Sequence, residues 1–118
     1  MIEKLDGVMV QGFMVDGRVY LATRSGRTNA AIEAEGLLRG ELGQRWIRLV
    51  AVACDANYTP LFEFCSPALS PSHAEPSLTL TALRHRGSGA YLPYARLATL
   101  AARFQVPIVP LLLSLIHI

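Results

Sequence analysis

The sequence Ile2-Glu3-Lys4-Leu5-Asp6-Gly7-Val8-Met9-Val10 decides how the rest of the chain is interpreted. Lys4 is the only lysine among 118 residues, and the other ten basic residues are all arginines. A lysine amine that loses its proton is a nucleophile, whereas an arginine guanidinium stays protonated. Asp6 supplies a hydrogen-bonding or metal-linked group beside the lysine, and Gly7 lets the backbone turn tightly. This stretch therefore predicts covalent catalysis by the Lys4 amine.

Two strands of a β-hairpin are expected directly after this stretch. Residues 7–15 and 18–23 are rich in apolar side chains with polar interruptions, and Asp16-Gly17 separates them. An Asp-Gly pair between two such runs is a strong signal for a hairpin turn. The cationic turn Arg24-Ser25-Gly26-Arg27 closes the second strand. Lys4 is thus expected at the mouth of a hairpin.

Two helices should follow the hairpin. Thr28 is the expected N-cap of a helix over residues 29–39, which Gly40 and Gly43 separate from a second helix over residues 44–54. Their spacing predicts that the apolar side chains facing the core are Ala31, Ile32, Ala34 and Leu38 in the first helix and Trp46, Leu49 and Val50 in the second.

A strand over residues 58–67 carries a single carboxylate. Side chains alternate across a strand, so Glu63 shares one face with Leu61 and Cys65, while Phe62 and Phe64 share the other. A carboxylate held opposite an aromatic core face can accept hydrogen bonds from ribose hydroxyls.

The remaining elements complete an α+β pattern. A Pro- and Ser-rich loop over residues 66–76 leads to a strand over residues 78–84, a turn, and a returning strand over residues 90–92. Pro93 is the expected first residue of a helix that continues over residues 94–104. Residues 106–109 are expected to begin another strand.

Three segments in this order resemble the motifs of the covalent nucleotidyltransferases, the superfamily of ATP-dependent DNA ligases, RNA ligases and mRNA capping enzymes. Lys4-x-Asp6-Gly7 resembles their nucleotide-accepting motif, and Phe62-Glu63-Phe64 followed by Pro67 resembles their third motif. The strand and turn after it, and the apolar residues directly after Gly7, are similar to the bacteriophage RNA ligases that repair broken tRNA. Many DNA ligases have an arginine where this chain has Met9.

The resemblance implies a fold, a site and a reaction. The fold would be an α+β nucleotidyltransferase domain, ATP-grasp-like, with antiparallel β-sheets and flanking helices, over residues 1–110. Lys4 would be the nucleophile that takes AMP from ATP in the presence of Mg²⁺, with Asp6 as the second catalytic residue. The residues implied to bind the nucleotide are Lys4, Gly7, Glu63 and either Arg24 or Arg27. The implied partners are RNA ends, with tRNA as one candidate.

Two later family motifs have no counterpart in the chain. No glutamate follows Glu75 and no lysine follows Lys4, so a Glu-Gly strand and a lysine-bearing strand are missing. We therefore expect a ligase domain truncated at both ends and inactive by itself, with residues 111–118 as an apolar tail of doubtful origin.

Composition sets further bounds. The net charge of +2 does not by itself indicate nucleic-acid binding, and the arginine clusters at positions 18, 24 and 27 and at 84 and 86 suit either phosphates or solvated strand edges. Cys54 and Cys65 are not spaced for a zinc site, so free thiols are expected and no metal-binding residue is assigned. The apolar residues 108–118 are too few to span a bilayer. These bounds fit a cytoplasmic enzyme fragment. Its oligomeric state does not follow from the sequence, and a monomer is expected.

Other interpretations remain open. Within the same chemistry, the chain is alternatively a DNA ligase or a capping guanylyltransferase. Outside it, the chain is a non-catalytic nucleic-acid-binding β domain in which the Lys-x-Asp-Gly sequence is accidental. A third alternative, an inactive fragment, is compatible with the ligase hypothesis.

Overall fold

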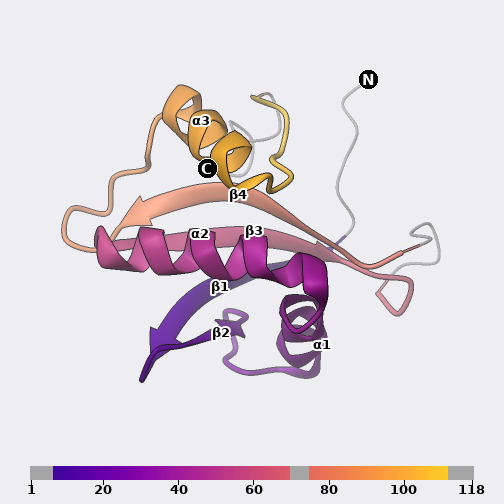
Figure 1. The fold of residues 1–118 in the computed structure, drawn as a ribbon. Coiled ribbons are helices and arrows are strands. Elements are labelled where there is room, and N and C mark those ends of the chain that lie inside the picture. Colours follow the sequence, from indigo (N-terminus) through magenta and orange to yellow (C-terminus); the bar gives the residue numbers. More distant parts are fainter. Residues whose placement is uncertain (1–6, 70–74, 112–118) are drawn as a thin grey trace.

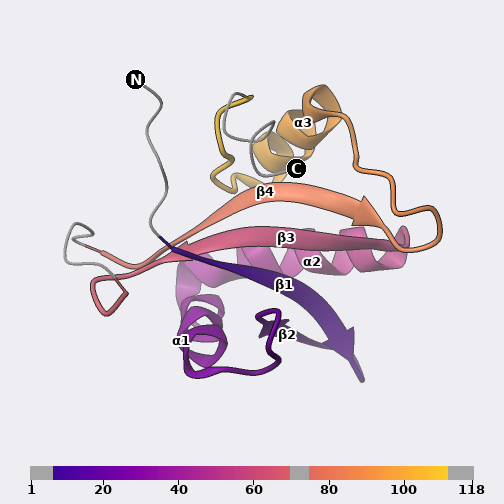
Figure 2. The same cartoon turned by 180° about the vertical axis from the view of Figure 1, so that it is seen from behind.

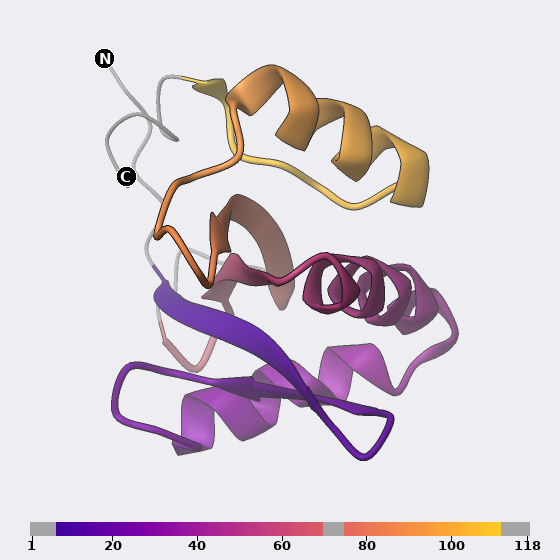
Figure 3. The same ribbon diagram turned by 90° about the vertical axis from the view of Figure 1, so that its left-hand side faces the viewer.

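The computed structural model describes residues 7–69 and 75–111, which form one antiparallel sheet flanked by helices. The strand order is β2-β1-β3-β4. Helices pack on one face of the sheet, and Figure 2 views the opposite face. Seen from the side, α2 lies between α1 and α3 (Figure 3). The elements are β1 (Val8–Val15), β2 (Arg18–Ala22), α1 (Asn29–Leu38), a 3₁₀ turn (Glu41–Gly43), α2 (Gln44–Asp55), β3 (Tyr58–Cys65), β4 (Ser77–His85) and α3 (Tyr94–Phe104) (Figure 1). The expected α+β class is confirmed.

The Asp16-Gly17 hairpin is confirmed. Asp16 and Gly17 have φ angles of 50° and 78°, the left-handed values that a two-residue turn needs to match the twist of its strands. The turn pairs Val15 with Arg18 and sets the register back to Gln11 opposite Ala22. Every side chain of β2 is thereby assigned to a face of the sheet.

Helix α1 begins at the predicted cap and shows one error in the predicted core. The Thr28 hydroxyl accepts a hydrogen bond from the Ala31 N–H at 3.4 Å. The prediction that Ile32 faces inward is wrong, because this side chain is 49% exposed. The buried stripe consists of Ala31, Ala34, Glu35 and Leu38, because i, i+3, i+4 and i+7 share one helix face and Ile32 falls outside it.

Helix α2 lies closely against the sheet. Leu49 and Val50 are fully buried, as expected, and the partly buried Trp46 donates its indole N–H to the Leu78 carbonyl at 3.1 Å. A Cβ at Gly12 of β1 would come within 3.0 Å of a Val50 methyl group. The missing side chain therefore allows the helix to approach the centre of the sheet.

Strand β3 has the predicted two faces. Phe62 and Phe64 are fully buried on the helical side, and Glu63 lies on the other. The strand ends at Cys65 rather than at Pro67, whose missing N–H cannot join a ladder.

The segments beside β4 differ from the expectation. The predicted returning strand makes a single bridge, Arg84 to Tyr91, and residues 106–109 make a single parallel bridge, Ile108 to Leu80. Pro93 and Pro107 limit both, since proline cannot donate to a ladder. Pro93 is the N-cap of α3 and not its first helical residue.

Two further expectations from the sequence concern the thiols and the membrane. Cys54 and Cys65 are not joined by a disulfide, as predicted. Within residues 7–69 and 75–111, no helix is long and apolar enough to cross a membrane. Part of the 66–76 loop and nearly all of the 111–118 tail lie outside the described residues.

The cap of α1 can be tested by Thr28→Ala, which removes the hydroxyl that accepts the Ala31 N–H. We expect the free energy of unfolding, measured in urea, to fall by about 1 kcal/mol. Thr99→Ala is the matched control, because Thr99 is exposed within α3 and alanine suits a helix interior. An equal fall in the free energy of unfolding of the two variants would contradict the assignment of Thr28 as the cap.

Candidate functional site

The face of the sheet turned away from the helices carries a hollow of about 440 Å³. β1, β2 and β3 contribute to its lining, which consists of Met9, Gln11, Ala22, Arg24 and Leu61. The strand register explains this set, because Gln11 lies opposite both Ala22 and Leu61. The hollow thus lies over β1, the middle of these three strands, near the first residues of that strand.

Arg24 reaches this hollow from a constrained turn. The Thr23 and Gly26 backbones exchange two hydrogen bonds of 2.8 and 2.9 Å, and Gly26 adopts a φ of 102°. The Thr23 hydroxyl bonds both the Gly26 carbonyl and the Thr28 hydroxyl. Among the described residues the only ion pair joins Arg27 to Glu35, so the Arg24 guanidinium has no acidic partner there. Arg24 is therefore a cation available to an anionic ligand.

Arg27, the alternative nucleotide-binding residue, is differently placed. Its guanidinium makes a bidentate contact with the buried Glu35 carboxylate, at 2.6 and 3.2 Å. Glu35 also accepts the Leu21 N–H at 3.1 Å. The structure thus separates the two candidates, with Arg24 beside the hollow and Arg27 in a structural ion pair.

Glu63 lies on the same face as the hollow and is only 4% exposed. It pairs across the ladder with Met9 of β1 and Thr79 of β4. Since Met9 also lines the hollow, the carboxylate and Arg24 flank the same strand of the sheet. The sequence analysis assigned Arg24 and Glu63 to one site although they lie about forty positions apart. The fold brings both to the open face of the sheet.

Gly7, the last residue of the Lys-x-Asp-Gly sequence, lies directly before β1 and beside the end of β3. A Cβ on Gly7 would overlap the Phe64 carbonyl oxygen and would come within 2.7 Å of the Cys65 sulfur. The glycine therefore allows the chain to enter β1 beside the end of β3, close in sequence to Glu63. Lys4 and Asp6, the expected catalytic residues, lie outside the described residues.

Thr81 supports the floor of the site and is not predicted by the sequence. It is 1% exposed, and its hydroxyl donates to the Leu61 carbonyl at 3.0 Å and lies 3.6 Å from the Met9 sulfur. The ladder between β3 and β4 is irregular between Leu61 and Phe62, where Thr81 is the extra residue of β4. No sequence signal indicates this bulge. Gln11 and Leu61 were also missed, although the hairpin register and strand alternation place them on this face.

A separate basic cluster lies where β4 ends. Arg86 donates to the Thr59 hydroxyl at 3.3 Å and contacts the Cys54 sulfur at 3.4 Å, while Arg84 donates to the Gly89 carbonyl. Burial raises the pKa of the Cys54 thiol, and the nearby Arg86 charge offsets part of that rise. Both arginines thus help to hold the turn after β4.

Comparison with known proteins relates this arrangement to one group of enzymes. No family model matches the chain. A curated putative RNA ligase from Thermovibrio ammonificans is 36% identical over 94 residues, which cover 76% of this chain and 24% of that protein. An archaeal ATP-dependent RNA ligase structure matches with a TM-score of 0.65 and 16% identity, over 92% of this chain and 29% of that one. The fold is that of the ATP-dependent RNA ligases.

Structures of a second enzyme agree with this assignment of the fold. Two variants of the Naegleria gruberi RNA ligase, one with ATP and Mn and one with AMP and Mn, match with TM-scores of 0.63 and 0.64 at 18% identity. Each match covers 91% of this chain and 33% or 34% of the ligase. The chain thus spans about a quarter to a third of the length of the proteins it matches.

The close approach at Gly7 predicts a specific cost for a methyl group there. We expect Gly7→Ala to lower the free energy of unfolding by about 1–3 kcal/mol, since backbone must shift to relieve the overlap. Gly36→Ala is the control, because Gly36 lies in α1 with open space where the methyl group would lie, and alanine there should stabilise by up to about 1 kcal/mol. Chemical denaturation of both variants measures the difference, and a neutral Gly7→Ala would refute the packing assigned to it.

Proposed function

We propose that this chain forms part of the nucleotidyltransferase domain of an ATP-dependent RNA ligase and belongs to that family. One observation carries the proposal. The Lys4-x-Asp6-Gly7 sequence leads through Gly7 into β1, and Arg24 and Glu63 flank β1 on the open face of the sheet. The sequence similarity to a putative RNA ligase and the shared fold support it.

The proposed reaction starts at Lys4. Its neutral amine attacks the α-phosphorus of ATP, a nitrogen–phosphorus bond forms, and the bond to the bridging oxygen breaks to release pyrophosphate. AMP then passes from the lysine to the 5′-phosphate of an RNA end. A 3′-hydroxyl attacks that phosphorus, AMP leaves, and the two ends are joined.

The described residues suit the binding of the nucleotide. The Arg24 guanidinium, which has no acidic partner in the described part of the chain, would bind phosphate oxygens through charge-assisted hydrogen bonds. The Glu63 carboxylate, which lies across Met9 from Arg24, would accept hydrogen bonds from ribose hydroxyls. Asp6 would hold the substrate or a metal-bound water near the amine.

Magnesium is proposed as the second cofactor, but the described residues do not form a protein site for it. No group of three or more His, Cys, Asp or Glu side chains among residues 7–69 and 75–111 could hold a metal ion. Mg²⁺ is commonly bound by substrate phosphates and waters with few protein ligands, and there it neutralises triphosphate charge. We assign no protein ligand to it.

The finer parts of the proposal follow the sequence resemblance. They are the bacteriophage type, a role in RNA repair with tRNA ends among the substrates, a monomeric state and a cytoplasmic location. Residues 1–110 are proposed as the domain portion, which is inactive without the segments that complete the ligase.

Covalent labelling tests the function directly. Because the chain spans about a quarter of its curated relative, the assay requires the protein from the complete open reading frame, obtained by sequencing the source DNA past both ends. With ATP labelled at the α-phosphate and Mg²⁺, we expect AMP on Lys4 and none on a Lys4→Arg variant, whose guanidinium stays protonated. Labelling by GTP instead of ATP would indicate a capping enzyme, and labelling that survives Lys4→Arg would reject the assigned nucleophile.

Glu63→Gln tests the ribose contact. Loss of the charged acceptor should raise the KM for ATP about tenfold to a hundredfold, because a hydrogen bond to a charged group contributes about 1.5–3 kcal/mol. Glu33→Gln, which removes an exposed charge on α1, is the control and should leave KM unchanged. A thermal melt of each variant shows that the fold is retained. An unchanged KM for Glu63→Gln would remove Glu63 from the proposed site.

A further inference from the structure

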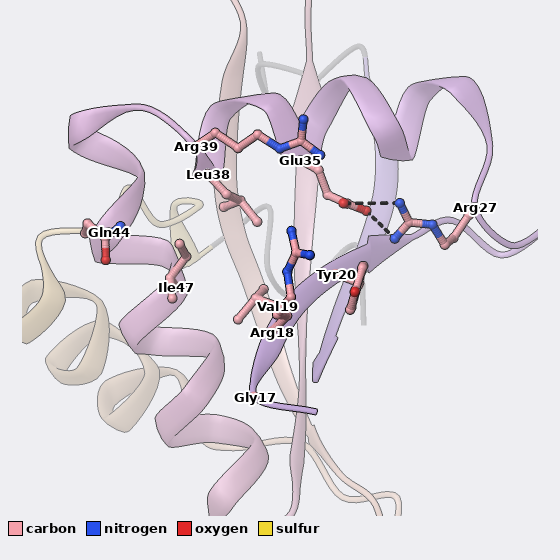
Figure 4. Close-up of a pocket in the computed structure, with 10 residues that line it drawn as sticks. All are labelled: Gly17, Arg18, Val19, Tyr20, Arg27, Glu35, Leu38, Arg39, Gln44 and Ile47. Atoms are coloured by element: carbon pink, nitrogen blue, oxygen red, sulfur yellow. Dashed lines mark hydrogen bonds and ion pairs between the residues drawn. The ribbon is translucent and has the colours of Figure 1, made fainter. Parts of the chain in front are cut away.

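A second hollow, of about 530 Å³, lies along the outer edge of β2, between that strand, α1 and the beginning of α2 (Figure 4). Three arginines line it: Arg18 on β2, Arg27 on the following turn and Arg39 at the end of α1. Among the described residues, Glu35 is its only acidic lining residue. This edge hollow is separate from the one on the open face, and the two share no lining residue in the described part of the chain.

The edge hollow has an excess of positive charge. The Glu35 carboxylate and the Arg27 guanidinium neutralise one another in their bidentate pair. Arg18 and Arg39 are exposed, and neither has an acidic partner within residues 7–69 and 75–111. Two uncompensated guanidinium groups therefore border a single concave site.

The strand edge adds a backbone donor. The Leu21 N–H points outward, since it donates to Glu35, and N–H groups two residues apart on a strand point the same way. The Val19 N–H consequently faces the hollow, where Val19 itself is a lining residue. The side-chain amide of Gln44 stands at the opposite wall and can donate as well.

Glu35 also limits what can bind to this edge. Its carboxylate occupies the position where an added strand would accept the Leu21 N–H. An incoming strand would need a row of such positions, whereas a phosphate oxygen needs only one N–H and nearby guanidinium groups. The donors at the hollow thus suit a compact oxyanion better than another polypeptide strand.

We infer that the edge hollow binds a backbone phosphate of the RNA substrate through Arg18, Arg39 and the Val19 N–H. This inference rests on the proposed function. Arg18 and Arg24 lie six residues apart along β2 and its turn, or about 20 Å at the rise of a strand. That separation corresponds to about six nucleotides of a stacked strand, so an RNA held at Arg18 can extend to the nucleotide bound beside Arg24. The hairpin would then bind the nucleotide on its open face and the RNA strand along its edge.

The test is the salt dependence of RNA binding to the 118-residue chain. The probe is a fluorescently labelled, 5′-phosphorylated single-stranded RNA, and the readout is anisotropy over a range of KCl concentrations. We expect Arg18→Gln/Arg39→Gln to weaken binding at least tenfold. The slope of log K against log salt should become shallower by about 0.7, since about 0.7 of a unit is lost for each phosphate contact removed from a single strand.

Arg96→Gln/Arg103→Gln is the matched control, because it removes the same charge from α3. It should leave the slope at the parent value, and melting temperatures identify any variant that fails to fold. Should the double variant unfold, Arg18→Lys/Arg39→Lys retains the charge, and its slope should stay near the parent value. Equal losses in the glutamine variant and the α3 control would overturn the inference, because binding would then follow net charge alone.

Two other outcomes would also overturn it. Competition by inorganic phosphate or ATP as effective as competition by RNA would assign the hollow to a small anion. A change in sedimentation of Arg18→Gln/Arg39→Gln without a change in RNA affinity would assign the edge to a second protein chain.

The anisotropy readout needs no catalysis, so it is independent of labelling at Lys4. If labelling fails while the RNA slope changes as expected, the proposed reaction is rejected and the RNA site stands.

Discussion

β1 pairs on both sides, with β2 through Gln11–Ala22 and with β3 through Gln11–Leu61, and these two registers determine where Glu63 and the lining of the open-face hollow lie. Side chains alternate along a strand, so a slip of one residue in either ladder would move Glu63 or Arg24 to the helical side. The Asp16-Gly17 turn sets the first register. The contact between Gly7 and the end of β3 accompanies the second. The open-face hollow depends on both.

Much of this arrangement could be predicted from the sequence. The hairpin, the Thr28 cap and the opposite faces of Glu63 and Phe62 each follow from a local rule that the tertiary structure does not override. Those rules also place Glu63 on β3 and Arg24 in the turn after β2, from which the two residues can share a site. The prediction that they bind a nucleotide depends on the resemblance, and labelling and KM measurements decide it.

The errors and omissions arise from long-range packing. The apolar character of Ile32 assigns it to the core, whereas Glu35 is buried instead, because an ion pair with Arg27 and the Leu21 N–H make burial of that carboxylate favourable. Neither partner is visible in the periodicity of α1. The short bridges beside β4 likewise depend on prolines whose pairing context the sequence does not reveal.

The strand order has a consequence for the timing of folding during synthesis. β1 can pair with β2 as soon as both emerge, but its other partner, β3, lies about 50 residues further along the chain. At translation rates of about 5–20 residues per second, the second side of β1 waits some 3–10 s for its partner. The helix that arrives first during this interval is α1, which brings Glu35 to Leu21 on the far side of β2. The outer edge of the hairpin, on β2, is thus covered first. A ribosome that paused before Tyr58 would leave the edge of β1 that pairs with β3 exposed for longer.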